Sequence, residues 1–415
     1  MPKVTPFKAI RPNPKVADKF CALPYDVYNR AEATEVVKAN PLSFLAIDRA
    51  ETSFSNAVDT YAPEVYAAAA QMLKMRREDG TLIQDAKPSY YIYELTMDGR
   101  TQTGIVACSS VDDYVNSVIK KHENTREDKE IDRIKHVDTT NAHTGPIFLV
   151  YRAKDEIRKI VQETKDNKKP LYDFTSDDGI RHRAFIIDES DKIEAIHSTF
   201  ENIDCTYIAD GHHRCASAVK VGLKRRKAES KPSDSEGYNR FLSVLFPDDE
   251  LMIMPYNRVV KDINNNTVEE LFDKIKEAGF EISDAASEAV APDKKGNFGM
   301  LLDGKWYTLT AKDKIKSDDP VKGLDVSILQ DNLLGPILGI ADPRTDKRID
   351  FVGGIRGLGE LEKRCLTDMR IAFSMYPTSI SELLEVADAG LLMPPKSTWF
   401  EPKLRSGMFI HSLDD

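Results

Sequence analysis

The sequence is poor in features that mark disulfide-bonded, zinc-binding and membrane proteins. Its five cysteines, at positions 21, 108, 205, 215 and 365, are odd in number, scattered, and form no C-x-x-C pair. Such cysteines fit a reducing compartment and buried thiols better than a disulfide framework or a cysteine zinc site. No apolar run approaches the length of a membrane span, and the first residues do not resemble a signal peptide. We therefore expect a cytoplasmic protein without a membrane partner.

The sequence also lacks a net positive charge. The chain has 58 lysines and arginines against 68 aspartates and glutamates, which gives a formal net charge of −10. A general nucleic-acid binder normally presents a basic face, so a nucleic-acid partner is disfavoured. A nuclease or DNA-partition protein would need a steep salt-dependent affinity for DNA to return as a candidate.

Several catalytic signatures are absent as well. The sequence has no G-x-x-x-x-G-K-[ST] loop, no G-x-S-x-G elbow, no H-E-x-x-H motif and no H-R-D and D-F-G pair. The glycine-rich residues 353–359 are wrongly spaced for G-x-G-x-x-G, and we interpret them as a turn before a helix that starts near Glu360. The common nucleophilic and kinase scaffolds are therefore disfavoured.

The most informative stretch is an Asp-Gly-His-His-Arg corner in the middle of the chain. Apolar residues run into Asp210 and Gly211, then His212, His213 and Arg214 follow, and a helical run of small residues begins. This order predicts a strand, a tight turn and a helix start. The first turn of a helix offers unpaired N–H groups and the positive end of the dipole, which together suit an anion.

The corner has a second interpretation, in which Asp210 is a helix cap and the cations are a solvated first turn. Cations at a helix N-terminus oppose the dipole, so three in succession are better explained if an anion lies between them. The composition suits a phosphate, with Asp210 available for a metal ion or a proton. Adjacent histidines face one metal ion awkwardly and no third ligand lies nearby in the sequence, so a zinc site is the weaker hypothesis.

A second polar stretch precedes the corner by about ninety residues. It contains His122, Glu123 and Arg126, followed by Asp132 and Arg133. An exposed, charged helix face explains this stretch about as well as a functional site does. The functional interpretation is that a phosphotransferase needs a carboxylate to accept a proton or hold Mg²⁺, together with cations for the phosphates.

The predicted class is α+β, a mixed α/β chain, in three parts. We place an N-terminal α/β region at residues 1–115, a core that carries the corner at 116–260, and a C-terminal α/β region at 261–415. Helical periodicity and Asp-Gly turns predict helices over 31–40, 63–77 and 267–278, a helix from Ser379, and hairpins at Asp98-Gly99 and Asp303-Gly304.

Two further expectations concern the sheet and one helix cap. Residues 241–246 and 251–255 have the composition of buried strands, and we expect both to complete the sheet that holds the corner. Asp325 is expected to cap a helix that runs to Leu334.

Several motifs together resemble the family called domain of unknown function 1015, over nearly the whole chain. The matching stretches are Pro24-Tyr25-Asp26-Val27, Lys-His-Glu-x-Thr at 121–125 with Asp132-Arg133, Ala209 to Arg214, Asp342-Pro343-Arg344, and Met393-Pro394-Pro395-Lys396-Ser397-Thr398-x-Phe400. Whether the motifs Pro24–Val27, Asp342–Arg348 and Pro394–Thr398 share the central site is left open, although five scattered polar motifs suggest one cleft.

The corner also resembles that of the ParB and sulfiredoxin-like superfamily, whose free-serine kinases carry this motif at the nucleotide phosphates and use a glutamate as base. The resemblance implies a ParB/sulfiredoxin-like central core with N- and C-terminal α/β additions. It also implies that Asp210 to Arg214 hold the phosphates of ATP or ADP and that Glu123 is the base.

The predicted function is that of a Mg²⁺-dependent phosphotransferase for a small hydroxylated metabolite, with free L-serine converted to O-phosphoserine as the best single candidate. The predicted catalytic residues are Glu123, Asp210 and His212; the nucleotide-binding residues are Gly211, His212, His213, Arg214, Arg126 and Arg133; and Asp210 is the predicted Mg²⁺ ligand. The alternative is a non-catalytic, ParB-like regulatory protein that binds nucleotide. Partners are the nucleotide and a small substrate, and assembly into a homo-oligomer is left open.

Overall fold

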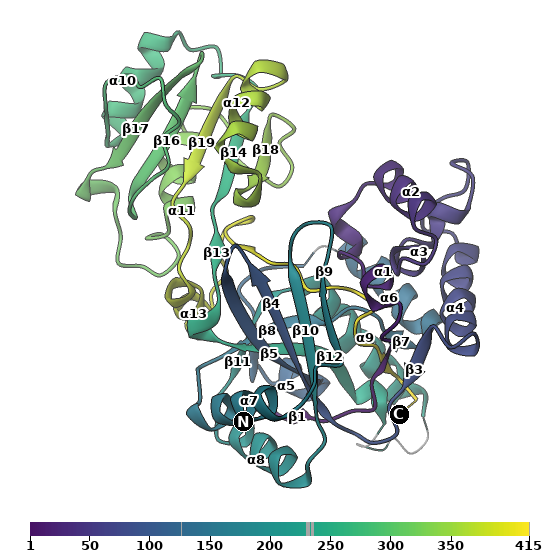
Figure 1. The fold of residues 1–415 in the computed structure, drawn as a ribbon. Helices are drawn as coiled ribbons and strands as arrows, with labels where there is room; N and C mark the ends of the chain where they lie inside the picture. Colours follow the sequence, from purple (N-terminus) through teal and green to yellow (C-terminus); the bar gives the residue numbers. More distant parts are fainter. Residues whose placement is uncertain (126, 230–232, 234–235, 415) are drawn as a thin grey trace. The chain divides into compact units, whose positions relative to one another are not determined.

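The computed structural model describes residues 1–125, 127–229, 233 and 236–414 (Figure 1). The chain divides into two compact units, which we call the first unit (Met1–Leu251 with Pro402–Asp415) and the second unit (Met252–Glu401). Helices and strands alternate irregularly in both, so the predicted mixed α/β class is confirmed. Within the described ranges, no helix combines the length and the apolar composition that crossing a bilayer requires.

The first unit is built on a nine-stranded sheet. Its order is β6-β11-β8-β12-β5-β4-β10-β9, and β1 pairs with β5 beside this path. The strands are β1 (Val4–Thr5), β4 (Tyr90–Met97), β5 (Arg100–Ser110), β6 (Ile119–Lys120), β8 (Ile147–Tyr151), β9 (Tyr172–Thr175), β10 (Arg181–Ile187), β11 (Thr206–Asp210) and β12 (Arg240–Pro247). The pairs β6–β11 and β8–β12 are parallel, and the other pairs are antiparallel.

Helices pack against this sheet and form a smaller N-terminal core beside it. They are α1 (Ala17–Phe20), α2 (Arg30–Ala39), α3 (Leu45–Asp48), α4 (Pro63–Glu78), α5 (Val111–Val115), α6 (Glu127–Thr140), α7 (Asp155–Asn167), α8 (Ser190–Glu201) and α9 (His212–Ala228). Two short pairs, β2 (Ile10–Pro12) with β3 (Leu82–Gln84) and β7 (Ala142–His143) with β21 (His411–Ser412), tie the chain ends to the N-terminal core.

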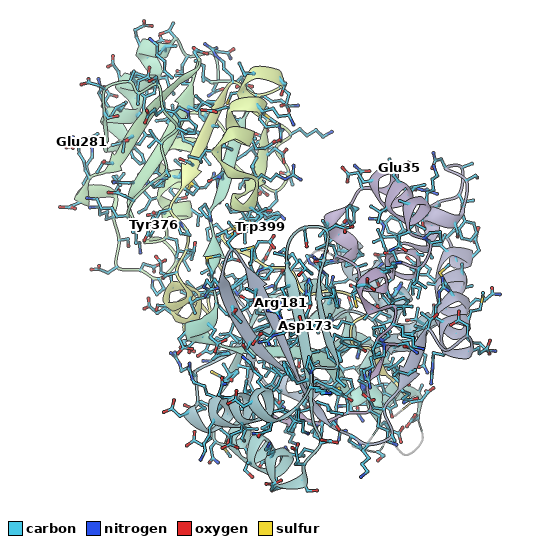
Figure 2. All side chains as sticks on the ribbon, viewed as in Figure 1. Glu35, Asp173, Arg181, Glu281, Tyr376 and Trp399 are labelled. Carbon is cyan, nitrogen blue, oxygen red and sulfur yellow. The ribbon has the colours of Figure 1, made fainter. Side chains whose placement is uncertain are left out.

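The cores follow the apolar faces of these elements. Ile157 of α7, Phe200 of α8 and Val219 of α9 pack against strand residues of the nine-stranded sheet. The outer antiparallel pair β9–β10 is more exposed, and there Arg181 and Asp173 form a cross-strand ion pair at 2.8 Å (Figure 2). Such an exposed pair contributes little to stability, so burial of the apolar faces holds the sheet together.

The second unit has a six-stranded sheet that is antiparallel throughout. Its strands, in order, are β15 (Phe280–Ile282), β17 (Lys305–Ala311), β16 (Asn297–Leu302), β19 (Ile371–Met375), β14 (Tyr256–Val260) and β18 (Ile349–Gly353). Its helices are α10 (Val268–Ala278), α11 (Asp325–Leu329), α12 (Gly357–Thr367) and α13 (Ile380–Asp388), and β13 (Ile253–Met254) pairs with β20 (Trp399–Phe400).

Local sequence signals located most of these elements. Both Asp-Gly turns close hairpins, because Met97 pairs with Arg100 across one and Leu302 with Lys305 across the other. The central residues have positive φ in both turns, which Asp and Gly tolerate. The helix at 267–278 begins at a Thr267–Glu270 capping box, in which each side chain bonds the other's backbone N–H.

Two expectations are wrong. Residues 251–255 do not complete the sheet that holds the corner, because β13 pairs with β20 of the second unit. Asp325 does not cap its helix: it is the first residue of α11, and its carboxylate accepts the Gly296 N–H at 3.0 Å. A local pattern identifies a strand or a polar helix start. It does not identify the strand that pairs with it or the group that bonds its side chain, because both come from a distant part of the chain.

The predicted boundary between residues 115 and 116 runs through one sheet. Strands β1, β4 and β5 precede it and pair with β10 and β12, which follow it. The predicted boundary falls at the end of α5, and the nine-stranded sheet contains strands from both sides of it.

Candidate functional site

A parallel strand pair brings the two polar stretches together. In the β6–β11 pair, Ile119 lies opposite Thr206 and Lys120 opposite Tyr207. Because neighbouring parallel strands end at the same edge of a sheet, the residues that follow β6 and those that follow β11 emerge side by side. His122 and Glu123 therefore lie next to the corner although about ninety residues separate them in sequence.

Gly211 makes the sharp turn from β11 into α9. Its φ of +88° and ψ of 30° are left-handed, a conformation that costs residues with a Cβ atom. An added Cβ would meet Ile147 Cα at 3.8 Å, an ordinary contact, so conformation rather than space requires glycine here. The turn directs the first N–H groups of the 17-residue helix α9 toward the same edge of the sheet.

Asp210 is ion-paired rather than free to cap the helix. Its Oδ2 contacts Lys403 Nζ at 2.8 Å, and its Oδ1 accepts the Gly211 N–H at 2.7 Å. Burial alone would raise the pKa of Asp210, but the Lys403 ammonium, with Arg214 and the Gly211 N–H, outweighs burial and lowers it to about 2. Asp210 is therefore a carboxylate at neutral pH, and the corner carries one more cation than the sequence motif shows.

Lys403 is the residue that sequence reasoning missed. It belongs to the C-terminal segment that returns to the first unit, 193 residues from Asp210. No local pattern marks it, because a lysine between Pro402 and Leu404 has no distinctive neighbour. Only the return of the chain end through β21 places it at the corner.

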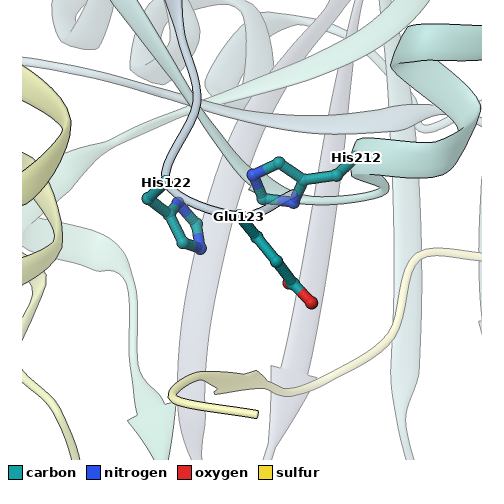
Figure 3. A group of neighbouring side chains, drawn as sticks. All are labelled: His122, Glu123 and His212. Atoms are coloured by element: carbon teal, nitrogen blue, oxygen red, sulfur yellow. The ribbon is translucent and has the colours of Figure 1, made fainter. Parts of the chain in front are cut away.

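Three potential ligand groups meet above the corner (Figure 3). His122, Glu123 and His212 each offer one ligand atom, and these atoms all lie within 4.8 Å of one another. The two imidazole rings are 4.5 Å apart between centroids and almost perpendicular, at 86°. We call this group the His–Glu–His cluster. His213 is not part of it, so two of the three ligand groups, His122 and Glu123, come from the other polar stretch.

Burial sets the protonation of the two imidazoles in the cluster. The exposed fractions are 1% for His122 and 5% for His212. Burial lowers the pKa of His122 to about 4, although the charge of Asp210 favours the protonated ring. Burial, with His122 beside it, also lowers the pKa of His212 well below its usual value. Both rings are neutral at pH 7 and available to bind through a nitrogen lone pair.

Arg214 points away from the cluster and contacts the Pro24–Val27 motif. Its Nη1 donates to the Pro146 carbonyl at 3.3 Å, its Nη2 lies 3.8 Å from Asp26 Oδ1, and its guanidinium carbon is 5.4 Å from the centre of the Tyr25 ring. Arg133 stacks on the same ring at 3.9 Å. The N-terminal motif thus joins the central site through Tyr25 and Asp26.

A cavity opens beside these cations. Its volume is about 30 Å³. Its lining residues are Tyr25, Asp48, Arg133, His136, Val137, His143, Thr144, Gly145, Ile147, Arg214, Ala218 and Leu242. The lining contains two guanidiniums and one carboxylate, and Ile147 and Arg214 also adjoin Gly211. The cavity therefore adjoins the corner, and its lining is of mixed charge, but a volume of about 30 Å³ holds water rather than a metabolite.

The buried side of α6 overturns the interpretation of this stretch as an exposed helix face. The exposed fractions are 5% for Glu130, 8% for Asp132 and 7% for Arg133. Arg133 bonds Asp132 at 2.9 Å, and the Tyr66 hydroxyl donates to Asp132 at 2.9 Å. A buried charge is retained when it is paired and hydrogen-bonded, as these are. Arg126 lies outside the described residues.

The remaining motifs belong to the second unit and have local partners there. Arg344 pairs with Asp342 at 2.9 Å on the surface. Ser397 donates to the Pro394 carbonyl at 2.6 Å, and its own carbonyl accepts the Thr378 hydroxyl at 3.0 Å. These contacts fix the loops themselves.

The fold and site define a mixed α/β protein with a polar strand-to-helix corner next to a charged cavity. The chain belongs to the family described as protein of unknown function (DUF1015), whose model matches residues 4–327. None of the curated proteins matches the sequence significantly.

Three solved structures align with about three quarters of the chain at low identity. Free serine kinase in complex with AMP is 15% identical, with a TM-score of 0.36, and the alignment covers 74% of this chain and 91% of the kinase chain. A conserved hypothetical protein from Pyrococcus furiosus is 15% identical, with a TM-score of 0.33, over 74% and 95%. SbnI with C-terminal truncation, from Staphylococcus aureus, is 11% identical, with a TM-score of 0.38, over 74% and 87%.

Proposed function

We propose that this protein is a phosphotransferase that uses ATP or ADP with Mg²⁺ to phosphorylate a hydroxyl group of a small metabolite, with free L-serine as the first acceptor to test. The observation that carries the proposal is the meeting of Glu123 with the N-terminus of α9. A carboxylate that can accept a hydroxyl proton then lies beside a turn that can hold a phosphate, as phosphoryl transfer requires.

The nucleotide phosphates would bind at the start of α9. Gly211 and the following N–H groups donate to phosphate oxygens, and His213 adds a further donor. His212 would act by hydrogen bonding rather than by charge, because burial keeps its ring neutral. Asp210 would position Mg²⁺ by exchanging the ammonium of Lys403 for the ion, and Lys403 would then be free to contact a phosphate.

The acceptor would bind at the charged groups beside Arg214, where the cavity of about 30 Å³ must widen to admit it. An amino acid is a zwitterion, and the lining offers the guanidiniums of Arg133 and Arg214 to its carboxylate and Asp48 to its ammonium group. Arg133 is fixed by Asp132 and by the Tyr25 ring, so little side-chain entropy would be lost on binding. In this arrangement Arg133 and Arg214 select the acceptor, and Arg126 keeps its predicted role in nucleotide binding.

Phosphorus NMR of the purified chain tests the proposal. The sample contains Mg²⁺, ATP or ADP, and a pool of hydroxylated metabolites including serine, and we expect the phosphoserine signal to appear. Glu123→Gln should abolish turnover while nucleotide binding persists, because the amide cannot accept the proton. Glu127→Gln is the matched control, since Glu127 is exposed at the first turn of α6.

The other outcomes separate the alternatives. Nucleotide that stays intact but protects the chain against thermal unfolding would favour the non-catalytic, nucleotide-binding regulator. Loss of nucleotide binding in Glu123→Gln would remove Glu123 from the role of base. If the chain shows neither turnover nor protection by nucleotide, the corner binds an anion other than ATP or ADP.

A further inference from the structure

The two histidines of the His–Glu–His cluster have buried ring nitrogens without a hydrogen-bond partner among the described residues. Within the part of the chain that the structure describes, three ring nitrogens of the cluster have no hydrogen-bond partner. They are Nδ1 and Nε2 of His122 and Nε2 of His212. The exposed fractions of His122 and His212 are 1% and 5%, so bulk solvent does not reach these rings. A buried polar atom without a partner costs roughly 1–3 kcal/mol, and such atoms commonly mark a missing ion or water.

The cluster is held by two separate elements, which fixes its geometry. His122 and Glu123 follow β6, whose parallel pairing with β11 places Ile119 opposite Thr206. His212 is the first residue of α9 and follows the left-handed Gly211. Ligands fixed from different elements can converge on one point without reorganisation of the backbone, a requirement for tight metal binding.

We propose that His122, Glu123 and His212 bind one divalent transition-metal ion, with Zn²⁺ as the reference ion. The ion would be coordinated by a nitrogen of each imidazole and a carboxylate oxygen. Two histidines and one glutamate are a known ligand set for zinc sites that keep a fourth position open. Imidazole nitrogens favour Zn²⁺, Co²⁺ and related ions, whereas Mg²⁺ and Ca²⁺ prefer oxygen ligands only.

The distances are compatible with this ion after a small contraction. Metal–ligand bonds of about 2.1 Å in a tetrahedron place ligand atoms roughly 3.4 Å apart. The three ligand atoms lie within 4.8 Å of one another, so rotations of the side chains must draw them together by about an ångström. The open position would face the start of α9, where an anion oxygen or water would complete the coordination.

The site has a consequence for the proposed phosphotransferase, and this step rests on that function. A carboxylate bound to a transition-metal ion is a much weaker base toward the acceptor's proton, because the ion withdraws its negative charge. Zn²⁺ in the His–Glu–His cluster would therefore inhibit transfer by taking Glu123 away from catalysis. The ion that supports turnover and the ion that binds this cluster are thus different.

Metal titration of the chelator-treated full-length chain tests the site without any activity assay. Co²⁺ is the spectroscopic probe, and we expect one equivalent to give visible absorption that one equivalent of Zn²⁺ abolishes. His122→Gln and His212→Gln should each weaken binding by more than the roughly 10–100-fold that loss of an outer partner costs. Zn²⁺ should raise the melting temperature of the unmodified chain and leave that of His212→Gln unchanged.

The control is a surface pair that could bind zinc adventitiously. His197 Nε2 lies 3.5 Å from Glu201 Oε1 on α8, one helical turn apart. His197→Gln should keep the tight Co²⁺ site. Loss of that site in His197→Gln, or its retention in both His122→Gln and His212→Gln, would overturn the assignment.

The two proposals fail in distinguishable ways. Turnover of nucleotide without a Co²⁺ or Zn²⁺ site would overturn the metal site and leave the phosphotransferase intact. A tight metal site that depends on the His–Glu–His cluster, in a chain without turnover, would overturn the phosphotransferase and leave the metal site intact. If both hold, one equivalent of Zn²⁺ inhibits phosphoserine formation in the unmodified chain, and turnover that continues in the zinc-loaded chain would overturn the shared use of Glu123.

Discussion

The two units differ most in where they hold histidine. All eight histidines of the chain lie in the first unit, and residues 252–401 contain none. Both tryptophans, Trp306 and Trp399, lie in the second unit. The first unit thus carries every imidazole, the side chain whose unperturbed pKa lies nearest neutral pH and the commonest metal ligand.

Sheet topology explains why polar groups converge in one unit. In the first unit, the parallel pair β6–β11 ends at one edge, so His122 and His212 meet there. In the second unit every pair is antiparallel, so adjacent strands end at opposite edges. Loops that follow neighbouring strands then diverge, and the motif Asp342–Arg348 makes ion pairs within itself and with Asp262 of the same unit.

The largest expected contrast is in acid stability. Burial lowers the pKa of His136 to about 4 and that of His182 to about 3, and it lowers the pKa of His143 well below its usual value. The unfolded chain takes up these protons near pH 6.5 and the folded unit does not, so the stability of the first unit falls as the pH drops below 6.5. Each such histidine contributes a loss of about 2 kcal/mol by pH 5.

Hydrogen exchange and fluorescence separate the two units in the intact chain. Between pH 7 and pH 5, peptides of the first unit should lose protection, while the urea midpoint seen by Trp306 and Trp399 should not fall. His182→Gln should reduce by one the number of protons that the first unit takes up on unfolding, which makes its stability less dependent on pH. An equal acid loss in both units would contradict the assignment of the effect to buried histidines.

A buried carboxyl group should give the second unit a pH dependence of opposite sign. Burial raises the pKa of Asp325 to about 6, and its exposed fraction is 8%. A folded pKa above the unfolded value of 3.8 means that stability is present below pH 3.8 and is lost as the pH rises through 6. Asp325→Asn, which keeps an oxygen for the Gly296 N–H, should raise the free energy of unfolding at pH 7.5 by up to about 3 kcal/mol.

Urea unfolding followed by tryptophan fluorescence measures this gain. The gain should vanish at pH 4, where the carboxyl group of Asp325 is protonated in the folded unit. Asp318→Asn is the control, because Asp318 is exposed and the change should leave stability within about 0.5 kcal/mol at either pH. A gain of the same size at both pH values would assign the effect to something other than ionisation.

The sequence predicted the local parts of this molecule better than its pairings. The Asp-Gly hairpins, the capped helices and the strand-to-helix corner at Gly211 follow from turn and cap chemistry, which acts within a few residues. Strand β6 has two residues, too few to show a period, so its pairing with β11 had no signal in the sequence. The ion pair of Lys403 with Asp210 and the convergence of Glu123 on His212 both depend on such long-range pairing.

The smallest expected effect on stability tests whether the corner is special. Gly211 has a φ of +88° and Gly304, in the second unit, a φ of +76°; an added Cβ meets nothing closer than 3.8 Å at Gly211 and nothing within 4 Å at Gly304. Alanine at either position therefore strains only the backbone, at a cost of about 1–2 kcal/mol. Urea unfolding should show similar losses in Gly211→Ala and Gly304→Ala.

Function should separate these two variants although stability does not. Gly211→Ala displaces the first N–H groups of α9, so we expect nucleotide binding to weaken at least about tenfold, which corresponds to about 1.4 kcal/mol. Gly304→Ala changes a hairpin turn and should bind nucleotide as the unmodified chain does. Calorimetric titration of both variants with ADP and ATP measures the difference. Equal binding by the two would mean that the helix N-terminus at Gly211 does not hold the phosphates, because a backbone site cannot tolerate a changed turn.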